Sequence, residues 1–161
     1  MIERALADAA ATERLGATLA RTVPWSAPQA LSVHLHGELG AGKTTLVRGL
    51  LRELGVTGTV RSPSYTLLES YDCNGRAVLH VDLYRLAGSG DVASLGLRDE
   101  ALPGVLLLVE WPERATDSLP GADLHVRLSI EGESRSAQVE SASTVGRAWL
   151  AAATSIAVSQ E

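Results

Sequence analysis

The sequence has a single cysteine, no phenylalanine and no long apolar run. One cysteine cannot build an intramolecular disulfide framework or a zinc–cysteine cluster, which suits a reducing compartment. No segment approaches the roughly 18 consecutive apolar residues of a membrane span. The first eight residues carry charge where a signal peptide needs an apolar stretch. We therefore expect a cytoplasmic protein.

Basic charge is also scarce, because the formal net charge at pH 7 is -5. This balance argues against a large basic surface that holds nucleic acid by its phosphates, so any RNA should be held mainly through a partner. The chain has no repeat, no low-complexity tract and no linker long enough to separate domains. Its 161 residues, 45% of them hydrophobic, predict one domain over 1–161.

A glycine-rich motif lies between a predicted strand and a predicted helix. Apolar residues alternate over 31–35, and residues 44–54 favour a helix. Between them, residues 37–44 match G-x-x-x-x-G-K-[ST], in which glycines let backbone N–H groups point at phosphate oxygens. The helix end adds partial positive charge, Lys43 can reach the β- and γ-phosphates, and Thr44 can bind Mg2+. The predicted nucleotide-binding residues of the loop are Glu38, Leu39, Gly40, Ala41, Gly42, Lys43, Thr44 and Thr45.

The rest of the chain reads as alternating helices and strands. The predicted helices are 11–23, 91–102 and 144–157, and the further extended segments are 65–71, 77–82, 105–109, 124–130 and 137–139. Asn74-Gly75 joins two of these segments as a hairpin turn. We predict an α/β fold of the P-loop NTPase kind, with three layers and a mixed, mainly parallel central sheet to which antiparallel hairpins are added.

Two carboxylates end apolar strands, Asp82 after residues 78–81 and Glu110 after residues 105–109. Acids at strand ends beside a phosphate-binding loop can hold Mg2+, although each could also be a solvated residue where a strand exits. Glu110 is the better candidate because its strand is wholly apolar. We predict Lys43, Asp82 and Glu110 as catalytic residues, and Thr44, Glu110 and Asp82 as metal ligands.

Two neighbouring features stay open at this point. The hydroxyl-rich segment 62–66 could respond to the γ-phosphate as a switch, or it could be an ordinary turn into a strand. Arg85 could neutralise charge in a transition state or pair with an acidic neighbour, and the pairing is the favoured interpretation.

Four segments together go beyond a general phosphate-binding loop: 37–45, 62–67, the His-Val-Asp-Leu-Tyr-Arg-Leu of 80–86, and the Val-Glu-Trp-Pro-Glu of 109–113. In order and spacing they resemble the TsaE (YjeE) family, and the likeness covers nearly the whole chain. The resemblance implies an ATPase that binds ATP/ADP and Mg2+ and works with TsaB and TsaD. It also implies a role in modifying the adenosine next to the anticodon of tRNAs that read codons beginning with A, and a place for Arg135 near the nucleotide.

The sequence departs from the family pattern in two places. Residues 62–64 read Ser-Pro-Ser where the family usually has Ser-Pro-Thr, and the acidic cluster before the first helix is reduced to Asp8. The alternative function is a small-molecule P-loop kinase, which should have an acceptor site and a basic lid, whereas the arginines here are scattered. A GTP-dependent switch should carry Asn-Lys-x-Asp, which is absent.

Overall fold

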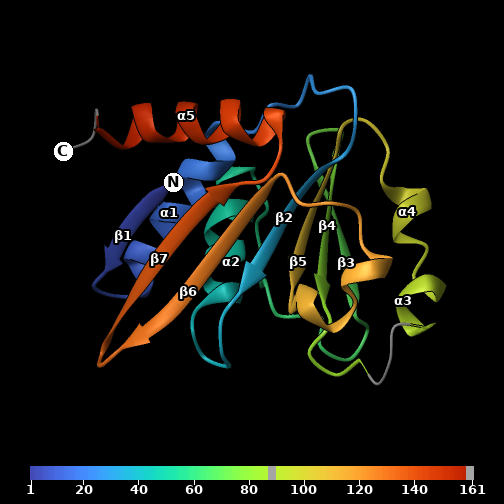
Figure 1. Ribbon diagram of the computed structural model, residues 1–161, viewed down its shortest axis with the longest axis horizontal. Coiled ribbons are helices and arrows are strands. Elements are labelled where there is room, and N and C mark those ends of the chain that lie inside the picture. Colours follow the sequence, from blue (N-terminus) through green and yellow to red (C-terminus); the bar gives the residue numbers. More distant parts are fainter. Residues whose placement is uncertain (87–89, 159–161) are drawn as a thin grey trace.

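The computed structural model describes residues 1–86 and 90–158, which form a mixed sheet with helices on both faces (Figure 1). Within these residues the sheet has seven strands in the order β1-β7-β6-β2-β5-β4-β3. The four central strands, β6 (Leu124–Glu131), β2 (Leu31–His36), β5 (Val105–Glu110) and β4 (Arg76–Asp82), are parallel. The outer strands, β1 (Ile2–Leu6), β7 (Ser134–Ser141) and β3 (Leu68–Cys73), are antiparallel to their neighbours. The predicted α/β class, with a parallel centre and antiparallel additions, is confirmed.

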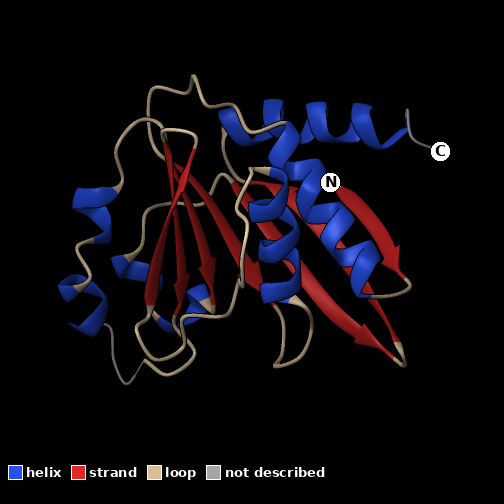
Figure 2. Cartoon of the chain, turned by 180° about the vertical axis from the view of Figure 1, so that it is seen from behind, coloured by secondary structure: helices blue, strands red, loops and turns tan. Residues whose placement is uncertain are grey.

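Helices α1 (Ala9–Arg21) and α2 (Lys43–Glu53) lie side by side over one face of the sheet (Figure 2). The remaining helical segments are α3 (Gly90–Ser94), α4 (Leu97–Glu100), η1 (Pro112–Arg114), η2 (Thr116–Ser118) and α5 (Thr144–Val158). Among the described residues, no helix combines the length and the apolar character that a membrane crossing requires.

The alternation of side chains along the central strands separates two apolar cores. On β5, Leu106 and Leu108 belong to the core under α1 and α2, while Leu107 belongs to the core on the opposite face. On β4, Val78 faces the α2 side, so His80 and Asp82, which follow it at intervals of two, point to the same side. The polar residues at the ends of these strands therefore meet the loop that precedes α2.

Two glycines bring α1 and α2 into near contact of their backbones. A Cβ atom added at Gly16 of α1 would lie 2.1 Å from the carbonyl oxygen of Leu46, and one added at Gly49 of α2 would lie 2.1 Å from that of Glu13. Neither position has room for a side chain, so α1 is seated directly on the helix that carries the phosphate-binding loop.

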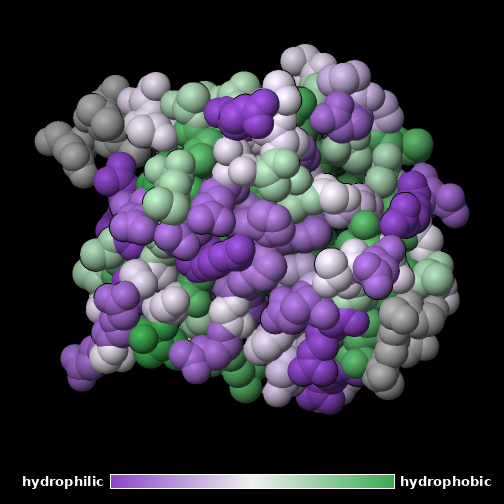
Figure 3. Space-filling model, viewed as in Figure 1, coloured by the Kyte–Doolittle hydropathy of each residue, from purple (hydrophilic) through white to green (hydrophobic). Residues whose placement is uncertain are grey.

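The outer half of the sheet has one solvated face. Val126, Leu128 and Val139 are buried in the core, whereas the alternate positions Arg127 and Ser129 are exposed. Figure 3 shows hydrophilic side chains gathered over β6 and β7 on this side. Such one-sided burial is typical of antiparallel additions to a parallel centre.

The structure corrects the sequence prediction in three places. Strand β1 was not predicted, because Ile2–Leu6 is short and charged and its partner β7 lies at the other end of the chain. The single helix predicted over 91–102 is wrong, since a turn at Gly96 separates α3 from α4. The segment predicted as extended from residue 65 becomes a strand only at Leu68, after a turn that ends in Leu67 at φ 63°. The other predicted elements are present with shifted ends.

Candidate functional site

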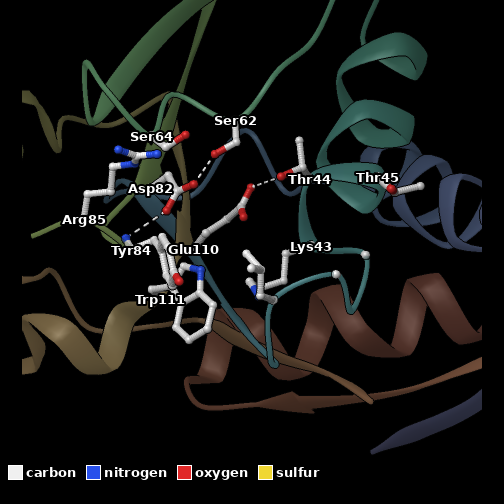
Figure 4. A pocket seen from close by; sticks show the side chains of 13 residues that line it. Lys43, Thr44, Thr45, Ser62, Ser64, Asp82, Tyr84, Arg85, Glu110 and Trp111 are labelled. Carbon is white, nitrogen blue, oxygen red and sulfur yellow. Dashed lines mark hydrogen bonds between the residues drawn. The ribbon is translucent and has the colours of Figure 1, made fainter. Parts of the chain in front are cut away.

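A cavity of about 400 Å³ opens where parallel strands β2, β4 and β5 end, the edge at which α/β sheets bind ligands (Figure 4). It is lined from the glycine-rich segment by Leu39, Gly40, Gly42, Lys43, Thr44 and Thr45, and from later segments by Ser62, Ser64, Asp82, Tyr84, Arg85, Glu110 and Trp111. The structure thus brings together the loop and both candidate acids.

The pairing of β4 with β5 sets the two acids side by side. Asp82 and Glu110 are register partners at the ends of these parallel strands, and both are almost fully buried. The hydroxyl of Thr44, in the first turn of α2, donates a hydrogen bond of 2.9 Å to Glu110 Oε1. A hydroxyl and two carboxylates therefore converge beneath the loop.

Backbone carbonyl groups of the glycine-rich loop hold the side chain of Lys43. Its ammonium donates to the carbonyl oxygens of Gly37 at 2.5 Å and Glu38 at 3.0 Å, and it lies 4.2 Å from the centre of the Trp111 ring. Burial lowers the pKa of Lys43, and the nearby carboxylates, led by Glu110, act in the opposite direction. A buried cation in a narrow, backbone-lined loop is a site for an anion.

The backbone of the loop explains its glycines. Gly42, directly before α2, has φ 106°, a left-handed conformation that residues with a side chain rarely adopt. Ala41 is fully buried, and its N–H donates to the carbonyl oxygen of Glu38 at 3.1 Å. Of the eight predicted loop residues, Glu38 and Ala41 do not line the cavity. They fold the loop instead.

The segment before β3 contacts the site through Asp82. The hydroxyl of Ser62 donates a hydrogen bond to Asp82 Oδ2, and the backbone N–H of Tyr84 donates to Oδ1 at 2.9 Å. Residues 64–66 form a turn, and Ser64 also lines the cavity. The hydroxyl-rich segment is therefore a turn that reaches the pocket.

Aromatic side chains surround the cavity. The rings of Tyr84 and Trp111 lie 5.0 Å apart, and the guanidinium of Arg85 lies 4.3 Å from the centre of the Tyr65 ring. Tyr65 itself is 83% exposed. Arg85 thus stands at the cavity with an aromatic partner, and its pairing with an acidic neighbour stays a prediction.

His80 is a site residue that sequence reasoning missed. Its side chain is fully buried, and Nε2 lies 2.8 Å from Glu110 Oε1, the same oxygen that Thr44 contacts. An ionised carboxylate only accepts hydrogen bonds, so Nε2 carries the proton. Nδ1 is buried and has no partner among the described residues. The signal was its place two residues before Asp82, which puts both side chains on one face of β4.

A second, smaller cavity of about 150 Å³ adjoins the loop on the side of β1 and α1. Arg135 of β7 lines it and donates to the carbonyl oxygen of Gly40 through Nη2 at 3.3 Å and Nε at 3.4 Å. Asp8 lines it as well, and its carboxylate accepts from the N–H of Ala11 at 2.7 Å, which caps α1. Thr12, Thr45 and Glu133 complete the polar lining.

The chemistry of the site fits a hard cation that is shared with a ligand. Among the described residues, no group of three or more His, Cys, Asp or Glu side chains is placed to hold a metal ion. Mg2+ does not need such a cage, because it usually binds one or two carboxylates together with waters and substrate phosphates. The oxygen atoms of Thr44, Glu110 and Asp82 are of that kind.

A family model described as "Threonylcarbamoyl adenosine biosynthesis protein TsaE" matches residues 6–139. The chain belongs to the TsaE family. The match includes every residue of both cavities described above, from Leu6 to Arg135.

Individual relatives agree with this membership. The chain is 40% identical over 119 residues to a protein of Haemophilus influenzae, covering 74% of this chain and 75% of that one. It is 37% identical over 140 residues to a protein of Nostoc sp., covering 83% and 82%. Both relatives are named "tRNA threonylcarbamoyladenosine biosynthesis protein TsaE". The crystal structure of Bacillus subtilis YdiB shares the fold, with a TM-score of 0.72 and 23% identity over 99% of this chain and 96% of YdiB.

Proposed function

We propose that this TsaE-family chain is a slow, Mg2+-dependent ATPase that serves the threonylcarbamoyladenosine modification of tRNA. One observation carries the proposal. Lys43, Thr44, Asp82 and Glu110 meet in a single cavity under a glycine-rich loop, in a chain whose relatives are named for this biosynthesis. The sheet runs without a break from β1 to β3, which supports one P-loop domain over residues 1–161.

The triphosphate of ATP is assigned to the larger cavity. Backbone groups of residues 38–45 and the ammonium of Lys43 supply the positive field, and α2 begins directly at the loop. The smaller cavity beside Arg135 and Asp8 is assigned to the nucleoside part, because it adjoins Gly40 and Gly42 on the other side of the loop. Asp8, although it stands alone where the family has an acidic cluster, lies at the right place to contact it.

Thr44 and Glu110 would hold Mg2+, with Asp82 close enough to join directly or through water. The ion, when bound with the nucleotide, supplies charge neutralisation for the γ-phosphate. The residues of the chain then have separate roles. Lys43 stabilises negative charge on the phosphates, and Glu110 holds Mg2+ in position. Asp82 accepts hydrogen bonds from Ser62 and from the backbone of Tyr84, and it orients the attacking water.

We also propose that the protein acts in the cytoplasm in a complex with TsaB and TsaD, and that tRNA is contacted mainly through these partners. The net charge of -5 supports an indirect contact with RNA. The modification concerns tRNAs that read codons beginning with A. The hydrolysis of ATP would serve the turnover of the complex.

The process is tested by depleting the protein and measuring threonylcarbamoyladenosine in bulk tRNA by mass spectrometry. We expect the modified nucleoside to fall, and an unchanged level would contradict the proposed role. The activity is tested separately with purified protein. Glu110→Gln should reduce Mg2+-dependent phosphate release strongly, while the matched surface variant Glu131→Gln should not. Transfer of the phosphate to a metabolite instead of water would favour the kinase alternative.

A further inference from the structure

A groove of about 280 Å³ lies between edge strand β1 and helix α1, and Ala153 of α5 is part of its lining. Figure 2 shows α1 lying across the sheet beside its edge strand. Its floor is apolar and is built largely from Ile2, Leu6, Leu15 and Leu19. Ile2, Leu6 and Leu19 are buried in the core, so the floor is a fixed part of the fold.

Two arginines flank this floor. Arg4 of β1 and Arg14 of α1 both line the groove, and neither guanidinium has a hydrogen bond or an ion pair with another residue in the described part of the chain. No acidic side chain lines the groove, although the whole chain carries a net charge of -5. The groove is therefore locally positive and apolar, and a carboxylate entering it would meet unpaired cations.

The backbone of β1 offers a third kind of contact. β1 is the first strand of the sheet order and pairs with β7 on one side only. Within the described residues, the N–H and C=O groups of its other edge have no strand partner, and such an edge can accept an added strand. Charges on an edge strand also resist aggregation, but that role does not require an apolar groove beside the strand.

We propose that this groove docks an extended segment of a partner protein that carries both apolar and acidic side chains. Its backbone adds to β1, its apolar side chains cover the half-buried Ala11 and Leu15, and its carboxylates reach Arg4 and Arg14. The proposal rests on the proposed assembly with TsaB and TsaD, and it assigns the segment to that complex. Leu6 lines both this groove and the cavity beside Arg135, so the docked segment adjoins the nucleotide site.

The role of Arg4 and Arg14 is tested by measuring how tightly the full-length protein binds the purified TsaB–TsaD complex in the presence of ATP and Mg2+. The double variant Arg4→Glu with Arg14→Glu should weaken binding by about tenfold or more. The matched control Arg98→Glu with Arg147→Glu changes the charge equally at exposed positions outside the groove, and it should bind like the wild type. If the wild type fails to bind, the proposed partnership itself is wrong. If it binds and the groove variant binds equally well, only the docking proposal is overturned.

Hydrogen exchange of the wild type tests the added strand without any substitution. Formation of the complex should slow the exchange of backbone amides in residues 1–7, whereas the exposed hairpin turn at residues 74–75 should exchange as before. Unchanged exchange in residues 1–7 of the bound protein would overturn the proposal. A groove variant that loses affinity for tRNA alone, with TsaB–TsaD binding intact, would assign the groove to RNA and would overturn it as well.

Discussion

The imidazole of His80, which is fully buried, donates from Nε2 to Glu110 Oε1 across 2.8 Å, while Glu110 itself lines the cavity. The donor fixes the orientation of a carboxylate that also accepts from Thr44. His80 thus resembles the residues that hydrogen-bond to a metal ligand and keep it oriented, with Glu110 as the ligand. We regard His80 as a positioning residue, because it acts through Glu110.

Replacing His80 by alanine should therefore raise the Mg2+ concentration needed for half-maximal ATP hydrolysis, by roughly 10-fold to 100-fold. His80→Gln, whose amide can still donate to Glu110, should recover part of the loss. A titration of activity with Mg2+ checks both variants. A His80→Ala protein that folds and shows the wild-type Mg2+ dependence would remove the positioning role.

Lys43 is the only lysine in the chain, so no other lysine side chain can replace it. Lys43→Ala should weaken triphosphate binding by about 1.5–3 kcal/mol, the usual range for a hydrogen bond that involves a charged group. This corresponds to an increase in Kd of roughly 10-fold to 100-fold, measured by calorimetry. Thermal unfolding of the variant without nucleotide serves as the control for its fold. Unchanged affinity would refute the assignment of the larger cavity to the phosphates.

His34, on the opposite face of β2 from the site, makes stability sensitive to acid. Burial, followed by the neighbouring His125 and His36, lowers the pKa of His34 from 6.5 to about 4. The unfolded chain therefore binds a proton below pH 6.5 that the folded chain takes up only near pH 4, and stability falls as the pH drops through this window. The loss due to His34 should be about 2 kcal/mol at pH 5.

Urea unfolding at pH 7.5 and pH 5 measures this effect. His34→Gln, whose amide can keep the bond to the Pro120 carbonyl oxygen, should lose less stability than the wild type between the two values. The same pH dependence in both proteins would show that His34 is not the responsible group.

The contact between α1 and α2 predicts a severe packing defect at Gly49. An alanine Cβ there would lie 2.1 Å from the carbonyl oxygen of Glu13 and 2.5 Å from its Cα, and backbone atoms of a helix cannot move aside cheaply. Gly49→Ala should reduce the free energy of unfolding by roughly 1–3 kcal/mol or more. Gly121→Ala is the matched control, because no atom lies within 4 Å of its added Cβ. Equal stability of the two variants would contradict the close approach.

The parts of the fold that follow local rules could be predicted from the sequence. Alternation in residues 31–35, the glycine-rich loop and the Asn74-Gly75 hairpin each carry their signal within a few residues. β1 could not be predicted in this way, because Ile2–Leu6 becomes a strand by pairing with β7, more than 100 residues later. The break between α3 and α4, in contrast, had a local signal, because Gly96 is a poor helix former and adopts a left-handed φ of 65°.

The same distinction holds for the site. The motif predicts Lys43 and Thr44 as site residues, the strand ends predict Asp82 and Glu110, and all four line one cavity. The bond between His80 and Glu110 depends on the adjacency of β4 and β5, which are joined by a connection of more than 20 residues. Arg135 and Asp8 line one cavity beside Gly40 only because segments near the two ends of the chain pack next to the loop. Contacts of this kind are set by topology and leave no local pattern.

The register that pairs Asp82 with Glu110 has a consequence for how the protein can change state. Hydrogen bonds of the ladder between β4 and β5 fix the backbone spacing between Asp82 and Glu110. A loop that closes over a ligand, or a partner that seats against the molecule, leaves that spacing unaltered. A difference between an active and an idle form must then arise in the side-chain rotamers of the two acids or in the segments that contact them, such as the one that carries Ser62, while the backbones that carry the acids stay at a constant separation.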